Sequence, residues 1–282
     1  MMKNNPKTTS DTLQSSRAYL LFLIVLFIPF SACAEEIKEP QTTGVLRSYT
    51  ILGLPLLSID ESLVMGLGVG FSTNPFKGVN DKTMPFPEIT YQNGNFTLDF
   101  SGIGYTVYSS EGCEITLLGS WRSAPYDSTD SSYLKGMENR NFVIEGGASL
   151  TGETPIGSVG IVAMSDVTNN HNGQYVTVQY SLPFGSESWG IEPVIGVNWE
   201  SKKIIGYYYG VRHSEVRDDR AFYDGKSTFT PFIGLNGGLK ISDNIYLQGG
   251  VNYEFLGNGI TESPLIDDKY VLSGSLSLSY SF

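Results

Sequence analysis

The sequence contains few of the residues from which metal sites and nucleic-acid-binding surfaces are built. Two Cys and two His in 282 residues leave no room for a Cys/His metal cluster. Charged residues make up 17%, below the ~25% of an average soluble domain. Asp and Glu outnumber Lys and Arg by 29 to 18, and the formal net charge of −11 argues against a nucleic-acid partner, because phosphates need a basic surface. We expect no metal, no cofactor and no nucleic acid.

One apolar run, Tyr19 to Phe30, stands near the start of the chain, and its 12 residues are too few to span a bilayer, which needs about 20. Basic residues precede it and Ala32-Cys33-Ala34 follows it. This layout is typical of a secretory signal peptide, here residues 1–34. An N-terminal anchor helix and a lipid anchor on Cys33 are the alternatives. Because Phe30 stands where lipoproteins usually carry Leu, we favour cleavage after Ala34 and expect an exported chain of residues 35–282.

Strict alternation replaces helical periodicity in the rest of the chain. From Tyr270 to Phe282 the even positions are mostly apolar or aromatic, whereas Ser occupies every odd position from 273 to 281. A period of two predicts a strand with one apolar and one polar face. These 13 residues exceed the usual soluble strand of about 5–6 residues and suit a tilted membrane strand of about 9–11.

The same pattern predicts strands throughout, with short turns and long loops alternating between them. Short turns are expected at 152–155, 184–188 and 242–244, and long loops at 123–140, 200–227 and 256–269. This alternation is typical of outer-membrane barrels. It breaks early, because 73–83 is long where a short turn is expected, and segment 96–108 has room for two short strands. Segment 156–165 has apolar residues on both faces.

We predict an all-β, transmembrane antiparallel β-barrel over residues 35–282. Eleven strands and a weak candidate at 44–52 can be counted, and the even number of strands in such barrels favours about 12. A secreted β-sandwich is the alternative, but its strands are shorter. Aromatic residues at strand ends, and a terminal Phe282, favour the barrel and the bacterial outer membrane.

Two groups of charged residues are candidates for function. The polar strand faces place an excess of carboxylates in the lumen, which would favour cations if water passes through. The alternative is a lumen filled by side chains. Loop 200–227 mixes basic, acidic and Tyr residues, so it either pairs with itself or contacts lipopolysaccharide phosphates. Lumen candidates are Asp99, Glu114, Glu145, Glu192, Glu254, Arg122 and Lys240, and candidate outer-loop contacts are Lys202, Lys203, Tyr207, Tyr208, Tyr209, Arg212, Arg217 and Arg220.

Catalysis is not expected from the two His residues. His171 and His213 both stand in predicted polar outer loops. Ser214 and Glu215 follow His213, but neighbours in sequence say little about the geometry of a catalytic triad.

From about residue 60 to its end the chain resembles the MltA-interacting protein (MipA)/OmpV family, and most closely the OmpV branch. The motifs that carry the resemblance are residues 66–70 (GLGVG), 134–137 (LKGM) with Arg140, 207–211 (YYYGV) with Glu215, 221–223 (AFY), 256–257 (LG), 263–266 (SPLI) and the last strand. The resemblance implies an outer-membrane barrel without catalytic residues. It implies a scaffold role with periplasmic murein-synthesis or murein-hydrolysis proteins for one branch, and osmotic-response, adhesion or porin-like roles for the other.

Two functional hypotheses follow. The first is an envelope interaction or scaffold protein that contacts outer-membrane lipid, lipopolysaccharide or the murein machinery. The second is a porin-like channel for small, preferentially cationic solutes.

Overall fold

The computed structural model describes residues 63–282. The predicted signal peptide with Cys33, and the weak strand candidate at 44–52, lie outside the described residues. The strands are β1 (Leu63–Ser72), β2 (Lys82–Asn93), β3 (Phe96–Asp99), β4 (Gly102–Ser110), β5 (Cys113–Arg122), β6 (Val143–Thr154), β7 (Gly157–Asp166), β8 (Gln174–Ser181), β9 (Phe184–Ser186), β10 (Trp189–Glu200), β11 (Thr228–Lys240), β12 (Ile245–Phe255) and β13 (Tyr270–Ser281).

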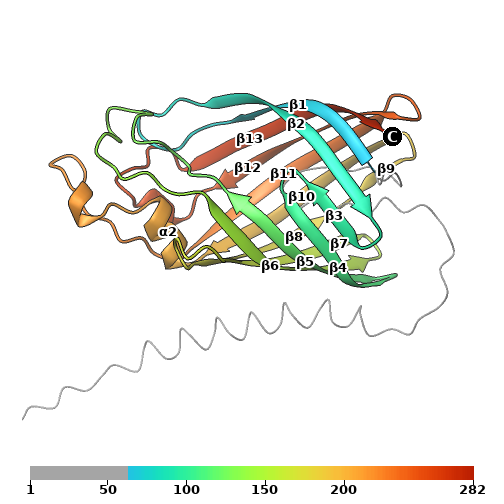
Figure 1. The fold of residues 1–282 in the computed structure, drawn as a ribbon, viewed down its shortest axis with the longest axis horizontal. Helices are drawn as coiled ribbons and strands as arrows, with labels where there is room; N and C mark the ends of the chain where they lie inside the picture. The colour runs from blue at the N-terminus through green and yellow to red at the C-terminus, as the bar shows by residue number, and fades with distance from the viewer. Residues whose placement is uncertain (1–62) are drawn as a thin grey trace, which may run out of the picture.

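These strands form one closed antiparallel barrel (Figure 1). Apart from β8 and β9, neighbours in the chain pair with each other, and β1 pairs with β13, from Val64 with Ser281 to Ser72 with Ser273, which closes the wall. β8 and β9 both pair with β10, at different heights, so they share one position. The barrel therefore has 12 wall positions, and the predicted fold class and strand number are confirmed.

The early part of the chain explains why the loop alternation seemed to break. Segment 96–108 does hold two strands, β3 and most of β4, and segment 156–165 belongs to the single strand β7 from Gly157 onward. With β3 and β4 counted separately, loop 73–81 falls at the same end of the barrel as the other long loops. The wall closes with the described strands alone.

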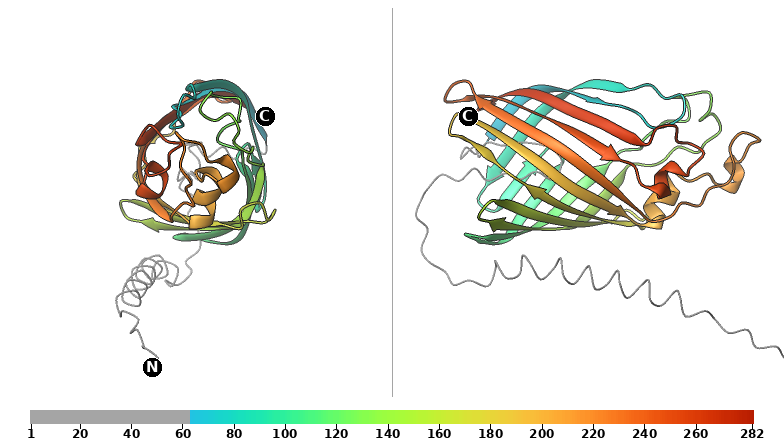
Figure 2. Two further views of the ribbon diagram at one scale, coloured as in Figure 1. Left: turned by 90° about the vertical axis from the view of Figure 1, so that its left-hand side faces the viewer. Right: turned by 180° about the vertical axis from the view of Figure 1, so that it is seen from behind.

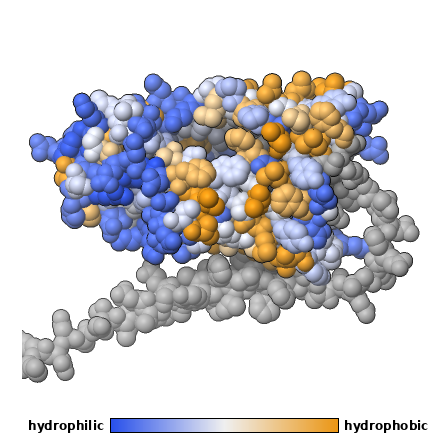
Figure 3. Space-filling model, viewed as in Figure 1, coloured by the Kyte–Doolittle hydropathy of each residue, from blue (hydrophilic) through white to orange (hydrophobic). Residues whose placement is uncertain are grey.

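The two faces of the wall follow the predicted alternation. On β13, Leu276 and Leu278 are exposed on the outside, whereas Ser277 and Ser279 face inward and are almost fully buried. Exposed apolar side chains recur on the other strands, and Figure 3 shows them spread over the wall, with hydrophilic residues gathered at the loop end. An apolar outer wall around a barrel closed by strand pairing is the arrangement that a lipid environment requires.

The long loops join into a compact structure at one end of the barrel, which we call the cap. It is formed by 73–81, 123–142, 167–173, 201–227 and 256–269, with helices α2 (Lys202–Tyr208), η1 (His213–Glu215) and α3 (Asn258–Thr261). Figure 2 shows α2 and α3 inside the ring of strands when the barrel is viewed from the loop end. Within residues 63–282 no helix has the length and hydropathy needed to cross a membrane.

The cap has a hydrophobic core of its own. Its buried members come from loops distant in sequence: Phe76, Tyr126, Leu134, Met137, Ile205, Val211, Ile260, Leu265 and Ile266. A second cluster joins Val143, Ile204 and Tyr208. Such packing makes the cap a folded layer across the barrel end rather than a set of independent loops.

Candidate functional site: the lumen cavity and the cap

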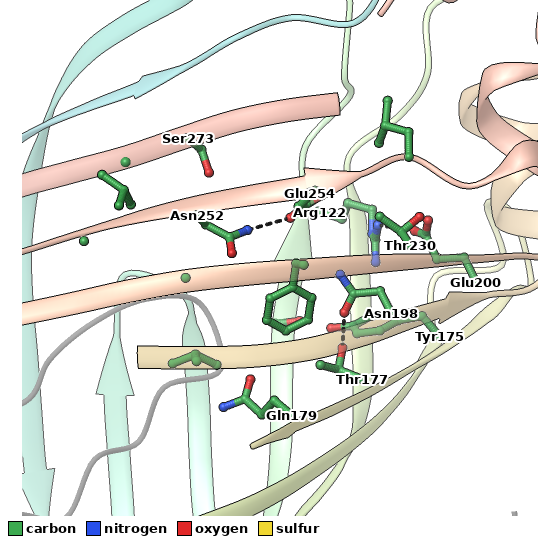
Figure 4. A pocket seen from close by; sticks show the side chains of 18 of the residues that line it. Arg122, Tyr175, Thr177, Gln179, Asn198, Glu200, Thr230, Asn252, Glu254 and Ser273 are labelled. Carbon is green, nitrogen blue, oxygen red and sulfur yellow. Dashed lines mark hydrogen bonds and ion pairs between the residues drawn. The ribbon is translucent and has the colours of Figure 1, made fainter. Parts of the chain in front are cut away.

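A cavity of about 560 Å³ occupies the half of the lumen nearest the cap. Its walls are the cap-side ends of β5, β6, β8 and β10–β13, and Tyr209, Leu256 and Ile260 contribute from the cap. Figure 4 shows polar side chains from several strands pointing into it, among them Thr177, Asn198 and Asn252. The volume falls in the range of small-molecule sites, about 300–1,000 Å³.

Arg122 is the charged centre of this cavity. Its Nε lies 3.1 Å from Oε1 of Glu145, and its Nη1 lies 3.2 Å from Oε1 of Glu200. The guanidinium also lies over the rings of Tyr175 and Tyr208. A third carboxylate, Glu254, accepts a hydrogen bond of 3.0 Å from the Asn252 amide. Three carboxylates thus face one guanidinium, and the cavity carries an excess of negative charge.

The other half of the lumen is filled by side chains. Glu88, Gln248 and Ser277 are almost fully buried there. The ring of Phe86 lies against Gly68 of the neighbouring strand, close enough that a Cβ at this glycine would overlap the ring. Phe232, in the wall of the cavity, lies against Gly196 in the same way. The strand glycines therefore make room for lumen-filling aromatics.

A buried ion pair holds the cap together. Nη1 of Arg140 lies 3.1 Å from Oε1 of Glu215, and neither side chain is more than 1% exposed. Arg140 also donates to the carbonyl oxygens of Tyr207 and Glu138, at 2.6 and 2.8 Å. Glu215 accepts backbone N–H groups of Arg212 and Glu138, at 2.8 and 2.9 Å. Burial alone would raise the pKa of Glu215, but hydrogen bonds from Arg140 and the two backbone groups outweigh it and lower that pKa.

Most of the candidate outer-loop residues are engaged inside the cap. Arg220 is buried and donates to the carbonyls of Glu215 and Tyr133, and Arg217 donates to the Tyr133 carbonyl and pairs with Asp219. Arg212 pairs with Glu138, and Lys202 pairs with Asp224.

The Tyr run and the neighbouring lysine have different surroundings. Tyr207 accepts the Asn141 N–H, Tyr208 is buried, and Tyr209 stacks on Phe76. Lys203 is exposed. Loop 200–227 therefore pairs partly with itself and partly with loop 123–142.

The predicted lumen residues lie at different places in the structure. Arg122, Glu145 and Glu254 line the cavity. Glu192 is buried deeper and accepts a hydrogen bond from Asn236 at 3.3 Å. Asp99 caps the β3–β4 turn by accepting the N–H groups of Ser101 and Gly102. Lys240 pairs with Asp243 in the β11–β12 turn.

Two further inward-facing carboxylates, Glu88 and Glu200, were not among the predicted lumen residues. Glu200 continues the polar face of 192–198 by one more step, so the alternation itself contained the signal. Glu88 stands in a strand interrupted by Pro85 and Pro87, where the pattern is harder to follow.

Neither His stands in a catalytic arrangement. His171 is buried, its Nδ1 accepts the Gly173 N–H, and its ring lies 3.8 Å from Asp166 and 3.9 Å from Glu145. Burial lowers its pKa, against the attraction of Asp166, so the ring is neutral at pH 7. His213 stacks on Phe222 at the cap surface. Between residues 63 and 282 no group of three or more His, Cys, Asp or Glu is arranged to hold a metal ion.

A closed antiparallel barrel with an apolar outer wall, tight turns at one end and long loops at the other defines a transmembrane β-barrel protein of the bacterial outer membrane. Residues 65–282 match the model of the family described as MltA-interacting protein MipA. The chain belongs to this family, as its motifs predict.

Relatives of known name agree with this assignment. YiaT, an outer membrane protein of Escherichia coli K12, is 27% identical over 79% of this chain and 92% of its own length. The MltA-interacting protein of the same organism is 24% identical, covering 77% and 89%. The outer membrane protein Omp26La of Vibrio anguillarum is 23% identical, covering 92% and 99%. Among solved structures, the translocator domain of the autotransporter NalP from Neisseria meningitidis aligns with a TM-score of 0.46 at 11% identity, over 80% of this chain and 90% of that one.

Proposed function

We propose that the protein acts as an outer-membrane interaction protein that presents its cap to a partner, rather than as an open pore. The observation that carries this proposal is the hydrophobic core of the cap, which joins loops distant in sequence across one end of the lumen. Together with the packed half of the lumen, it supports a rigid, closed body.

A protruding segment of the cap is the candidate contact surface. Residues 211–223 form a hairpin, with bridges between Val211 and Tyr223 and between Arg217 and Arg220. It extends beyond the barrel end at the left of Figure 1. Val216 and Phe222 expose apolar surface on it. An ordered hairpin with exposed apolar side chains is suited to binding, because little entropy is lost when it docks.

A murein-related partner is the second part of the hypothesis, and it concerns the opposite end of the barrel. One relative is named for interaction with MltA. A periplasmic partner would meet the tight turns, where Ile156 and Ile241 are exposed. These turns offer little surface compared with the cap, so we place the main contact on the cap.

Site-specific photo-crosslinking in intact cells tests the location of the partner. A photoreactive amino acid at Phe222 probes the cap, one at Ile156 probes the turns, and one at the lipid-facing Leu276 is the matched control. Adducts with lipopolysaccharide or a surface protein at 222, absent at 276, support the proposal. Adducts with a murein enzyme at 156 alone would move the contact to the periplasmic end.

A porin-like channel for small cationic solutes is the alternative function. The excess of Glu145, Glu200 and Glu254 over Arg122 in the cavity favours it, because negative walls attract cations. Planar-bilayer recording of the refolded protein separates the two functions. The interaction role predicts silence. Reproducible, cation-selective single-channel events, weakened when Glu254 is replaced by Gln, would establish the channel instead.

A further inference from the structure

The barrel wall has a gap in its hydrogen bonding beside β2. All of Leu63–Ser72 in β1 pairs with β2, but only residues 91–93 of β2 pair with β3. In the part of the chain that the structure describes, residues 82–90 of β2 thus have a ladder on one side only. β3 ends at Asp99 and β4 begins at Gly102, so the ladder beside β2 stops at Tyr91.

The sequence of β2 is adapted to an unpaired edge. The two-residue turn Gly94-Asn95 joins Asn93 to Phe96, so Asn93 bonds toward β3. The N–H and C=O groups of successive residues in a strand point to opposite sides, so those of residues 91, 89, 87 and 85 also point to the side of β3. Two of these, Pro85 and Pro87, have no N–H to leave unpaired. Proline is excluded from paired central strands and is found on edges, so the gap is a feature that the sequence specifies.

The gap has defined borders. On the cap side, Asp130 of loop 123–142 pairs with Lys82 at the start of β2, at 3.9 Å, and Ser131 donates to the Lys77 carbonyl in loop 73–81, at 2.9 Å. On the turn side, the Asp99 carboxylate caps the β3–β4 turn. These contacts bound the stretch of wall between β2 and the end of β5 that lacks a backbone ladder, which we call the window.

Aromatic side chains lead through the window from lumen to membrane. Phe86 faces inward, its ring 6.1 Å from that of Phe100 in the β3–β4 turn. Phe100 lies 6.4 Å, edge to face, from Trp121 on β5. Trp121 also lines the cavity, next to Arg122. An apolar path therefore adjoins a cavity in which carboxylates outnumber basic groups.

We propose that the window is a lateral site for a cationic amphiphile, whose charged end lies in the cavity and whose apolar chain lies along Phe86, Phe100 and Trp121 toward the bilayer. The carboxylates of Glu145, Glu200 and Glu254 select the positive end and reject an anionic one. Aromatic faces suit both an alkyl chain and a quaternary ammonium group. This site is independent of any partner that binds the cap.

Fluorescence quenching in nanodiscs tests the site, with 11-bromoundecyltrimethylammonium as the probe. Trp121 is isolated by W189F and W199F, and a matched protein keeps Trp189 alone through W121F and W199F. The two indoles are similarly exposed to lipid, 40% for Trp121 and 46% for Trp189, so Trp189 reports quenching by probe dissolved in the bilayer. We expect saturable quenching of Trp121 at concentrations where Trp189 shows only a shallow, linear loss.

Variants and a second probe make the result specific. Phe86→Ala and Phe100→Ala should each raise the half-saturating concentration about three- to tenfold, the effect of losing one aromatic contact. Phe229→Ala, on the lipid-facing wall, should leave it unchanged, and heat-modifiable gel mobility confirms that each variant is folded. The anionic 11-bromoundecanoate should not saturate. Identical linear quenching of both indoles, an equal effect of Phe229→Ala, or equal saturation by the anionic probe would overturn the proposal.

Discussion

Replacement of Glu215 by Gln is the most direct test of the cap as a folded unit. The carboxylate accepts two hydrogen bonds from Arg140, at 3.1 and 3.3 Å, and two from backbone N–H groups, at 2.8 and 2.9 Å. A Gln side chain has the same shape but turns one acceptor into a donor, which then faces other donors. It also leaves the buried guanidinium without its counter-charge.

The size of the effect follows from burial. Removing one partner of a buried ion pair costs about 3–5 kcal/mol, and a factor of ten corresponds to about 1.4 kcal/mol. We therefore expect amide hydrogen exchange in the cap, at 134–141 and 204–216, to accelerate by roughly two to three orders of magnitude. The barrel strands should keep their protection and their heat-modifiable mobility, because the pair lies outside them.

Glu138→Gln provides the control. Glu138 pairs with Arg212, but its side chain is 54% exposed, and exposed pairs contribute about 0–1 kcal/mol. In Glu138→Gln, the rate of amide hydrogen exchange in the cap should change less than tenfold. If Glu215→Gln exchanged no faster than this control, the cap would not depend on the buried pair. If it lost the folded barrel altogether, the cap would not be separable from the wall.

Three further predictions concern the membrane faces, the orientation and the pH dependence. Leu276→Lys, on the lipid-facing side, should lower the free energy of unfolding by about 2–4 kcal/mol near the bilayer midplane, whereas Ser275→Lys, in the cavity wall, should be tolerated. Urea titration of folding into vesicles measures both variants, and equal losses would refute the face assignment. An epitope at Asp218 should be labelled on intact cells and one at Asp243 only after permeabilisation, and the reverse would invert the topology. Burial holds the pKa of His171 below its usual 6.5, so the locally unfolded cap binds one more proton than the folded cap once the pH falls below about 6.5. Protection of the amides of 167–173 against hydrogen exchange, corrected for intrinsic exchange rates, should therefore fall between pH 7.5 and 5. The same pH dependence in His171→Gln would contradict this prediction.

Alternation in the sequence predicted which face each side chain occupies but not its height in the barrel. A period of two assigns Glu145, Glu192 and Lys240 to the inner face equally well. Height depends on strand register and tilt, which no local pattern contains. Only the assembled wall shows that Glu145 reaches the cavity, that Glu192 lies further from the cap, and that Lys240 pairs with Asp243 in the β11–β12 turn.

The cap could be predicted in composition but not in pairing. The mixed charges of loop 200–227 allowed either self-pairing or contact with lipopolysaccharide. In the structure its basic residues pair both within the loop, as Lys202 with Asp224, and outside it, as Arg212 with Glu138. The decisive partners, however, lie far away in the chain. Arg140 and Glu215 are 75 positions apart, and Arg122 and Glu200 are 78 apart. Such pairs form because barrel closure brings loops and strand ends that are distant in the sequence to the same end of the barrel.

The window, by contrast, has a local signature in the sequence. Outward-facing apolar residues fall on the even positions Phe96 and Leu98 in β3 and on the odd positions Ile103 and Tyr105 in β4, so the alternation changes phase at the β3–β4 turn. A change of phase within so short a stretch indicates a turn or a bulge, because one regular continuous strand would place half of these side chains in the lumen. Pro85 and Pro87 are incompatible with a strand paired on both sides. The short strand and the prolines are therefore one feature: where β3 stops, β2 has no N–H groups at those two positions to leave unpaired in the membrane.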